Sequence, residues 1–156
     1  MCSSDLTFFF TIPSEGMKEE VAMPKAIRTE VPVLGSPVVL VAEDDISNVQ
    51  FIEAVLRKTA VTLLVANNGQ EAVEQCRAHP EISLVLMDIK MPVMDGLEAT
   101  QEIKSFRKDL PIIAITAFAM NGDETRASEA GCDDYLAKPV SMELLFEKLQ
   151  QYGIPL

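Results

Sequence analysis

The stretch ISLVLMDIKMPVMDG, at residues 82–96, is the part of the chain that decides the fold. It begins with a run, Ile82 to Met87, that is apolar apart from one serine, and it continues through Asp88 into a turn that contains Pro92 and Asp95-Gly96. A short apolar run that does not alternate with polar residues is typical of a strand buried on both faces, as in a parallel sheet. The stretch therefore predicts a buried strand that ends at an acidic residue.

The same pattern extends along the chain in both directions. The predicted strands are Val38–Ala42, Val61–Ala66, Ile82–Met87, Pro111–Ile115 and Asp134–Ala137. The predicted helices are Ile46–Lys58, Gln70–Ala78, Leu97–Phe106, Ala119–Ala130 and a last one from its N-cap Ser141 to Tyr152. Strands and helices that alternate in this way predict an α/β fold: a doubly wound parallel sheet with helices on both faces.

Composition and charge narrow the function classes. Hydrophobic residues make up 48% and charged residues 24% of the 156 residues, which is typical of a globular domain. The net charge of −11 disfavours nucleic acid and anionic lipid as partners. No apolar run approaches the roughly 20 residues that span a bilayer. Cys2, Cys76 and Cys132 match neither a disulfide framework nor a metal-ligand spacing, so we expect reduced thiols.

Asn67-Asn68 follow the second predicted strand and are assigned no role, whereas charged or hydroxyl side chains follow the other four. They are Glu43, Asp44 and Asp45 after the first strand, Asp88 after the third, Thr116 after the fourth, and Lys138-Pro139 after the fifth. Because the carboxyl ends of parallel strands meet at one edge of the sheet, where ligands bind, we expect these groups to converge. Asp45 directly precedes the first helix and is expected to cap it.

These residue types suit phosphoryl transfer to an aspartate. Asp44 and Asp88 both follow strands that end at this edge, so they can share one hard cation, and Mg²⁺ prefers oxygen ligands from one or two carboxylates together with a phosphate. Asp88 also has Thr116 and Lys138 as neighbours that can bind phosphoryl oxygens. In-line attack by a carboxylate requires positioning and charge neutralisation, and its product is an aspartyl phosphate.

Four motifs in this order resemble the receiver domains of two-component response regulators. They are Glu43-Asp44, the stretch at residues 87–96, Thr116-Ala117, and the YLAKP sequence at residues 135–139. The resemblance covers residues 37–156 and implies a flavodoxin-like (βα)5 domain with strand order 2-1-3-4-5. It also implies a domain that accepts a phosphoryl group on Asp88 from a phosphohistidine, and that catalyses its own phosphorylation and dephosphorylation without being a kinase.

The resemblance assigns further roles to individual residues. It implies that Asp44, Asp88 and the backbone carbonyl of Lys90 bind Mg²⁺ directly, and that Glu43, where the family often has Asp, acts through a water. Thr116 and Tyr135 are expected to carry the conformational switch, although Tyr135 is also explained as a half-buried tyrosine of an edge strand.

Four further expectations follow from the same resemblance and sequence. Lys138-Pro139 resembles the family's cis-proline turn. Phe118 and Lys90 occupy positions where the family varies its hydrolysis rate, and their bulk predicts a long-lived phosphate. His79, the single histidine, is expected to be a surface residue at a helix end rather than a phosphohistidine. Met87, Met91 and Met94 are expected to pack beneath the loop that follows Asp88.

The N-terminal region is expected to lie outside this domain. The run Leu6–Ile12, closed by Pro13, is rich in aromatic and β-branched residues and predicts a strand. Residues 1–15 resemble the last strand of a histidine-kinase ATP-binding domain, and residues 16–36 form a linker; an accidental β-prone tail is the alternative. The resemblance implies a hybrid sensor kinase as the parent protein, with a cytoplasmic receiver, a parent that can be membrane-anchored, and no output domain after Leu156.

Three other functions compete with this interpretation. A metal-dependent phosphohydrolase that forms an aspartyl phosphate has its nucleophile after the first strand in an Asp-x-Asp pattern, which Glu43-Asp44-Asp45 does not match. A flavodoxin-like cofactor binder needs a loop rich in Ser, Thr and Gly after that strand, and this loop is acidic. A degenerate receiver that acts only in docking is disfavoured by the intact acids, Thr116 and Lys138. The expected partner is a histidine-phosphorylated kinase or phosphotransfer domain.

Overall fold

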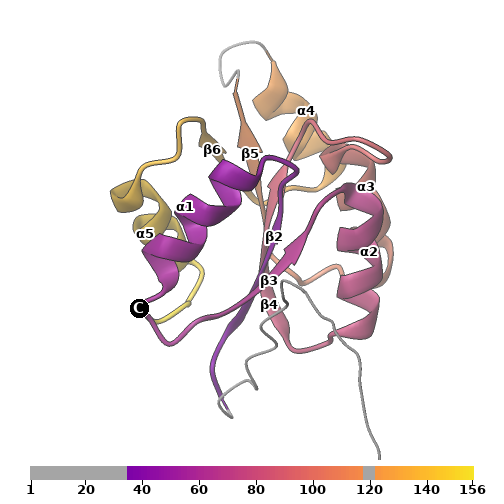
Figure 1. Cartoon of the computed structure of the whole chain (residues 1–156). Coiled ribbons are helices and arrows are strands. Elements are labelled where there is room, and N and C mark those ends of the chain that lie inside the picture. Colours follow the sequence, from indigo (N-terminus) through magenta and orange to yellow (C-terminus); the bar gives the residue numbers. More distant parts are fainter. Residues whose placement is uncertain (1–34, 118–121) are drawn as a thin grey trace, which may run out of the picture. The chain divides into compact units, whose positions relative to one another are not determined.

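The computed structural model of the chain describes residues 35–117 and 122–156 (Figure 1). The strands are β2 (Val38–Ala42), β3 (Thr62–Ala66), β4 (Ile82–Asp88), β5 (Ile112–Thr116) and β6 (Asp134–Ala137). The helices are α1 (Ile46–Leu56), α2 (Gly69–Ala78), α3 (Gly96–Phe106), α4 (Asp123–Ala130) and α5 (Met142–Gln151). The expected N-terminal strand at residues 6–12, the linker up to residue 34 and Phe118 lie outside the described residues.

The described strands form one parallel sheet in the order β3-β2-β4-β5-β6. Counted along the chain, this is the expected order 2-1-3-4-5. Helices α1 and α5 cover one face of the sheet, and α2, α3 and α4 cover the other (Figure 1). The fold is therefore the doubly wound α/β domain that the sequence predicts. The strand order reverses between β2 and β4, so the carboxyl ends of these two strands define the edge where a ligand is expected.

Each face of the sheet has its own apolar core. One is built on Leu40, Val85 and Ile112 together with residues of α2 and α3, and the other on Val41, Leu86 and Ile113 together with residues of α1 and α5. Neighbouring residues of each central strand point to opposite faces, so β2, β4 and β5 are buried on both sides. The central strands are thereby fixed by packing from both layers.

Side-chain caps start four of the five helices. Asp45 caps α1, Asn68 caps α2, Asp95 caps α3 and Ser141 caps α5, each by accepting hydrogen bonds from backbone amides of the first turn. The cap by Asp45 accepts from the Ser47 amide at 2.8 Å, as the sequence predicts. Each of these caps ends a loop that follows a strand, so the caps at Asp45, Asp95 and Ser141 also fix the loops that surround the predicted site.

Several boundaries differ from the prediction by one or two residues. Strands β4 and β5 continue through Asp88 and Thr116, because backbone pairing with the neighbouring strand extends to these polar residues. Helix α1 ends at Leu56 and not at Lys58, where the Thr59 amide and hydroxyl both donate to the Leu56 carbonyl. Apolar spacing within residues 46–58 predicts that Phe51 shares a buried helix face with Val49 and Ile52, but Phe51 is 38% exposed.

In the described part of the chain, none of the helices combines the length and the apolar character needed to cross a membrane. Cys76 is buried against α3 and β4 in the core, and burial raises the pKa of its thiol to about 11. His79 is the C-cap residue of α2, with a side chain 45% exposed. Met87, Met91 and Met94 all belong to or pack against one core cluster. These features agree with the structural roles expected for them.

Candidate functional site

The sheet brings four of the predicted site residues to one edge. Asp88 is the last residue of β4 and Thr116 the last of β5, while Glu43 directly follows β2 and Lys138 directly follows β6. Backbone hydrogen bonds hold each loop onto the neighbouring strand: Ile89 N donates to Ile115 O at 3.1 Å, and Lys138 N donates to Thr116 O at 2.7 Å. The polar side chains thus start from a rigid parallel sheet.

The backbone beneath Asp88 is packed against the start of α3. The Gly96 amide donates to the Ile89 carbonyl at 2.8 Å. A Cβ atom on Gly96 would collide with the Asp88 carbonyl oxygen and would lie 2.9 Å from its carbonyl carbon. Only glycine permits this approach, so Gly96 sets the position of the backbone that carries Asp88.

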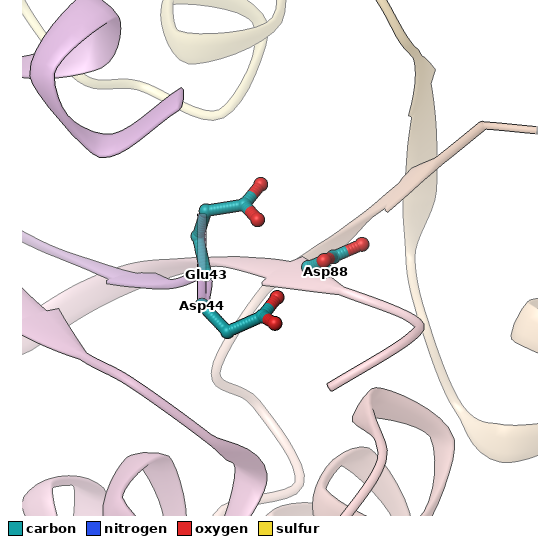
Figure 2. A group of neighbouring side chains, drawn as sticks. All are labelled: Glu43, Asp44 and Asp88. Atoms are coloured by element: carbon teal, nitrogen blue, oxygen red, sulfur yellow. The ribbon is translucent and has the colours of Figure 1, made fainter. Parts of the chain in front are cut away.

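Three carboxylates converge at the ends of β2 and β4. Each of Glu43, Asp44 and Asp88 offers one carboxylate oxygen, and these oxygens all lie within 4.8 Å of one another. Figure 2 shows the three side chains projecting to the same side of the view. Glu43 is 1% and Asp88 5% exposed, whereas Asp44 is open to solvent. Carboxylates gathered this closely need a cation between or beside them.

The cluster has the donor set that Mg²⁺ prefers. All three groups are hard oxygen donors, and Asp44 keeps one side open for bound waters and a phosphate. Oxygen Oε1 of Glu43 accepts from the Asp45 amide at 3.1 Å. The other oxygen, Oε2, is buried and lies 3.0 Å from Nζ of Lys138, so Glu43 joins the acidic cluster to that lysine. The residues present therefore fit a magnesium site.

Lys138 supplies positive charge next to two of these carboxylates. Its Nζ lies 3.0 Å from Glu43 Oε2 and 3.3 Å from Asp88 Oδ2. Burial acts to lower the pKa of this ammonium, but pairing with Glu43 and Asp88 outweighs burial, and the net pKa is raised. The Lys138–Pro139 peptide bond is cis. Lys138 therefore stays charged at neutral pH, where it can pair with the ionised carboxylates.

The ionisation of Asp88 is disfavoured before a cation binds. Burial first, and the negative charge of Glu43 second, raise its pKa from 3.8 to about 6, while Lys138 acts in the opposite direction. At neutral pH the carboxylate is still largely ionised, as a nucleophile must be. Because burial and Glu43 disfavour the ionised form, a cation bound beside Asp88 would stabilise this carboxylate more than it would stabilise an exposed one.

Thr116 and Tyr135 lie on adjacent strands but in different environments. Thr116 is 2% exposed, and its hydroxyl donates to Asp123 Oδ2 at 3.0 Å. Tyr135 is 38% exposed. Hydrogen bonding to Glu124 and the negative charge of its carboxylate raise the pKa of the Tyr135 phenol. Sequence reasoning missed Asp123, since nothing in its local pattern distinguishes it from an ordinary acid in the first turn of a helix.

Lys90 is exposed two residues after Asp88, in the loop between β4 and α3. The metal contact expected of Lys90 is made by its backbone carbonyl, so it does not depend on the lysine side chain. The structure thus brings together Glu43, Asp44, Asp88 and Lys138, and it places Thr116 beside them on β5.

The response regulator receiver domain family matches residues 39–150, which include every residue of this edge. The chain belongs to this family. Receiver domains generally bind Mg²⁺ at an acidic pocket, in agreement with the carboxylates gathered here.

Known receiver domains resemble this one in sequence and in structure. The hybrid signal transduction histidine kinase I of Dictyostelium discoideum is 39% identical over 117 residues, which are 70% of this chain and 7% of the kinase. The chain therefore spans only a small part of that relative.

Two solved structures are similar to this receiver domain over most of its length. The receiver domain of sensor histidine kinase PA1611 from Pseudomonas aeruginosa, solved with magnesium in its active-site cleft, is 36% identical with a TM-score of 0.71, over 76% of this chain and 98% of that one. A chain in the co-crystal structure of the Saccharomyces cerevisiae phosphotransfer protein Ypd1 with the receiver domain of Ssk1 is 33% identical, with a TM-score of 0.71, over 76% and 89%.

Proposed function

We propose that this receiver domain takes a phosphoryl group from a phosphohistidine onto Asp88 and then switches or relays the signal in a phosphorelay. The observation that supports this most strongly is the position of the Asp88 carboxylate at the end of β4. One of its oxygens lies within 4.8 Å of carboxylate oxygens of Glu43 and Asp44, and its Oδ2 lies 3.3 Å from Lys138 Nζ.

Asp44, Asp88 and the Lys90 carbonyl would hold Mg²⁺ directly, and Glu43 would hold it through a water. When bound, the ion supplies positive charge that neutralises the acids and the phosphoryl oxygens. The burial of Glu43 and the short distances from its carboxylate to those of Asp44 and Asp88 support its role toward a metal-bound water.

The chain's own residues then perform the transfer. An Asp88 oxygen attacks phosphorus in line; the new O–P bond forms as the P–N bond to the donor histidine breaks, and the imidazole leaves with the electron pair. Lys138 neutralises charge on the phosphoryl oxygens, and Thr116 donates a hydrogen bond to one of them. Because the pKa of Asp88 is about 6 in the metal-free chain, the nucleophilic form dominates at neutral pH.

The partner is a histidine-phosphorylated kinase or phosphotransfer domain. Ssk1, whose receiver domain was crystallised with the phosphotransfer protein Ypd1, supports this class of partner. Relatives that are hybrid histidine kinases support a hybrid kinase as the parent protein. In that arrangement residues 1–15 belong to the kinase, 16–36 form the linker and 37–156 form a cytoplasmic receiver.

Phosphorylation is read out through Thr116 and Tyr135. Movement of the Thr116 hydroxyl toward the phosphoryl group lets the Tyr135 ring occupy the space left behind, which changes the surface formed by α4, β6 and α5. Both residues lie next to α4, and this position supports such a coupling.

The test is labelling with Mg²⁺ and a small phosphodonor such as acetyl phosphate. We expect one phosphoryl group per chain, in an acid-stable and base-labile adduct that needs Mg²⁺. Asp88→Asn should not be labelled, whereas the exposed control Asp109→Asn should be labelled normally. Equal labelling of Asp88→Asn and the unaltered chain would contradict the proposal.

A further inference from the structure

One buried acid near the site is not part of the magnesium cluster. Asp123 is the first residue of α4, and it is 7% exposed. Its Oδ2 accepts a hydrogen bond from the Thr116 hydroxyl at 3.0 Å, and its Oδ1 lies 3.4 Å from a guanidinium nitrogen of Arg126. Both oxygens of the Asp123 carboxylate therefore have partners. One of these partners is the Thr116 hydroxyl, which the proposed function directs to a phosphoryl group on Asp88.

The hydroxyl of Thr116 cannot serve both acceptors at once. A threonine hydroxyl has a single proton to donate. As long as that proton is directed to Asp123, it is not available to a phosphoryl oxygen on Asp88. A hydrogen bond to a carboxylate is stronger than one between neutral groups, and a buried acceptor that loses its donor is destabilised. The hydrogen bond to Asp123 thus opposes the movement of Thr116.

We propose that Asp123 is a positioning residue that holds the Thr116 hydroxyl away from Asp88 until the domain is phosphorylated. Phosphorylation then has to break the bond between Thr116 and Asp123, which couples the phosphoryl group to the first turn of α4. This inference rests on the proposed function of Asp88 and Thr116, and it adds the residue that opposes the switch.

The next residue of α4 connects this contact to the second switch residue. Glu124 follows Asp123 in the chain and interacts with the phenol of Tyr135. Consecutive acids in one helical turn therefore contact the two side chains expected to switch. Arg126 stays beside Asp123 when Thr116 leaves, so the carboxylate keeps one charged partner and the cost of switching is moderate.

The test uses beryllofluoride with Mg²⁺, which mimics a phosphoryl group without forming a lasting covalent bond. Because the chain contains no tryptophan, binding is followed by amide chemical shifts in NMR titrations. We expect Asp123→Ala to bind the mimic about three- to tenfold more tightly than the unaltered chain, the effect of one hydrogen bond of ordinary net strength. Glu129→Ala, which removes an exposed acid from the same helix, should leave binding unchanged.

A double-mutant cycle separates this role from a general effect on stability. In a Thr116→Val background the gain from Asp123→Ala should disappear, because the bond that it removes is already absent. Unchanged or weaker binding by Asp123→Ala overturns the inference, and so does an equal gain in the Thr116→Val background. If Asp123→Ala does not fold, Asp123→Asn decides instead, with an expected gain of about two- to threefold because a neutral acceptor replaces the carboxylate.

The two proposals fail differently in this experiment. If the folded, unaltered chain binds no mimic, the proposed function is wrong and this inference falls with it. If the unaltered chain binds the mimic and Asp123→Ala binds it no better, the proposed function stands and only the role of Asp123 is wrong. The carboxyl ¹³C signal of Asp123 in the unaltered chain gives a second measurement, because it should shift when the mimic displaces the Thr116 hydrogen bond.

Discussion

The residues of the site differ in how far their positions could be predicted from sequence. Asp88, Thr116 and Lys138 are predictable because each lies at or next to the carboxyl end of a strand, and parallel strands bring such positions to one edge. That Lys138 pairs with Glu43 as well as Asp88 is not predictable, since it depends on side-chain conformations. The contact between Thr116 and Asp123 depends on where α4 begins relative to β5, which no local pattern specifies.

The buried charge of Asp88 should make the metal-free protein less stable at neutral pH. Its pKa is raised from 3.8 to about 6 in the folded chain. A raised pKa means that folding favours the protonated form of Asp88. The contribution of this group to stability is therefore fully present below the pKa of the unfolded chain, and it is lost as the pH rises through the pKa of the folded chain. At about 1.4 kcal/mol per unit of pKa, the loss above pH 6 is at most about 3 kcal/mol.

We therefore predict that Asp88→Asn is about 1–3 kcal/mol more stable than the unaltered chain at neutral pH without metal, because it removes this ionisation. Urea unfolding in a chelator measures the difference, which should shrink toward acidic pH, and excess Mg²⁺ should stabilise only the unaltered chain. Asp109→Asn, at an exposed position, is the control. An Asp88→Asn variant that is less stable at neutral pH without metal would show that the buried charge does not lower the free energy of unfolding.

At the scale of elements, the strands and caps are predictable and some tertiary anchors are not. Asp45 and Ser141 are typical N-cap residues directly before amphipathic stretches, and both cap as expected. Arg107, by contrast, donates to the carbonyls of Cys76, His79, Pro80 and Ile82, and so ties the end of α3 to the turn between α2 and β4. An arginine after a helix has many alternative partners, so its sequence position alone does not predict this contact.

The start of α3 provides a test of how the element supports the site. Gly96→Ala should cost about 1–3 kcal/mol of stability, because the added methyl group meets backbone atoms of Asp88 and Ile89 that cannot move independently of the sheet. Phosphorylation of the folded variant should also be slower, since the backbone that carries Asp88 is displaced.

Gly153→Ala is the matched control, measured by the same unfolding and labelling assays. Gly153 has a φ of +81°, but a methyl group added there would have no heavy atom within 4 Å beyond its neighbours in the chain, so the substitution strains only the local backbone. We expect Gly153→Ala to lose some stability and to be phosphorylated at the normal rate. If Gly96→Ala is phosphorylated as fast as Gly153→Ala, close packing of α3 under Asp88 is not needed for the chemistry.

For the whole molecule, alternation of buried strands and amphipathic helices was enough to predict a doubly wound parallel sheet, and the resemblance to receiver domains supplied the order of its strands. Right-handed crossovers restrict the topology, and the acids after β2 and β4 mark the point where the order reverses. The exposure of a residue such as Phe51 is harder to predict, because helical periodicity assigns a residue to a helix face only to within one position. The role of residues 1–36 remains a prediction from resemblance, since nearly all of these residues lie outside the part of the chain that the structure describes.

The receiver should function without the N-terminal region. Both apolar cores are formed within residues 35–156, so a fragment of these residues should fold cooperatively. We predict that this fragment is labelled by a phosphodonor to the same extent as the full chain, with the same dependence on Mg²⁺. A fragment that fails to fold or to be labelled while the full chain succeeds would move the domain boundary toward the N-terminus.

The central claim is that Asp88 is the residue that carries the phosphoryl group. Borohydride reduces an aspartyl phosphate to homoserine, which marks the phosphorylated residue permanently. After labelling with a phosphodonor and Mg²⁺, reduction and peptide mass spectrometry, we predict homoserine at position 88. Homoserine at Asp44 or at another acid, with Asp88 unmodified, would contradict the claim.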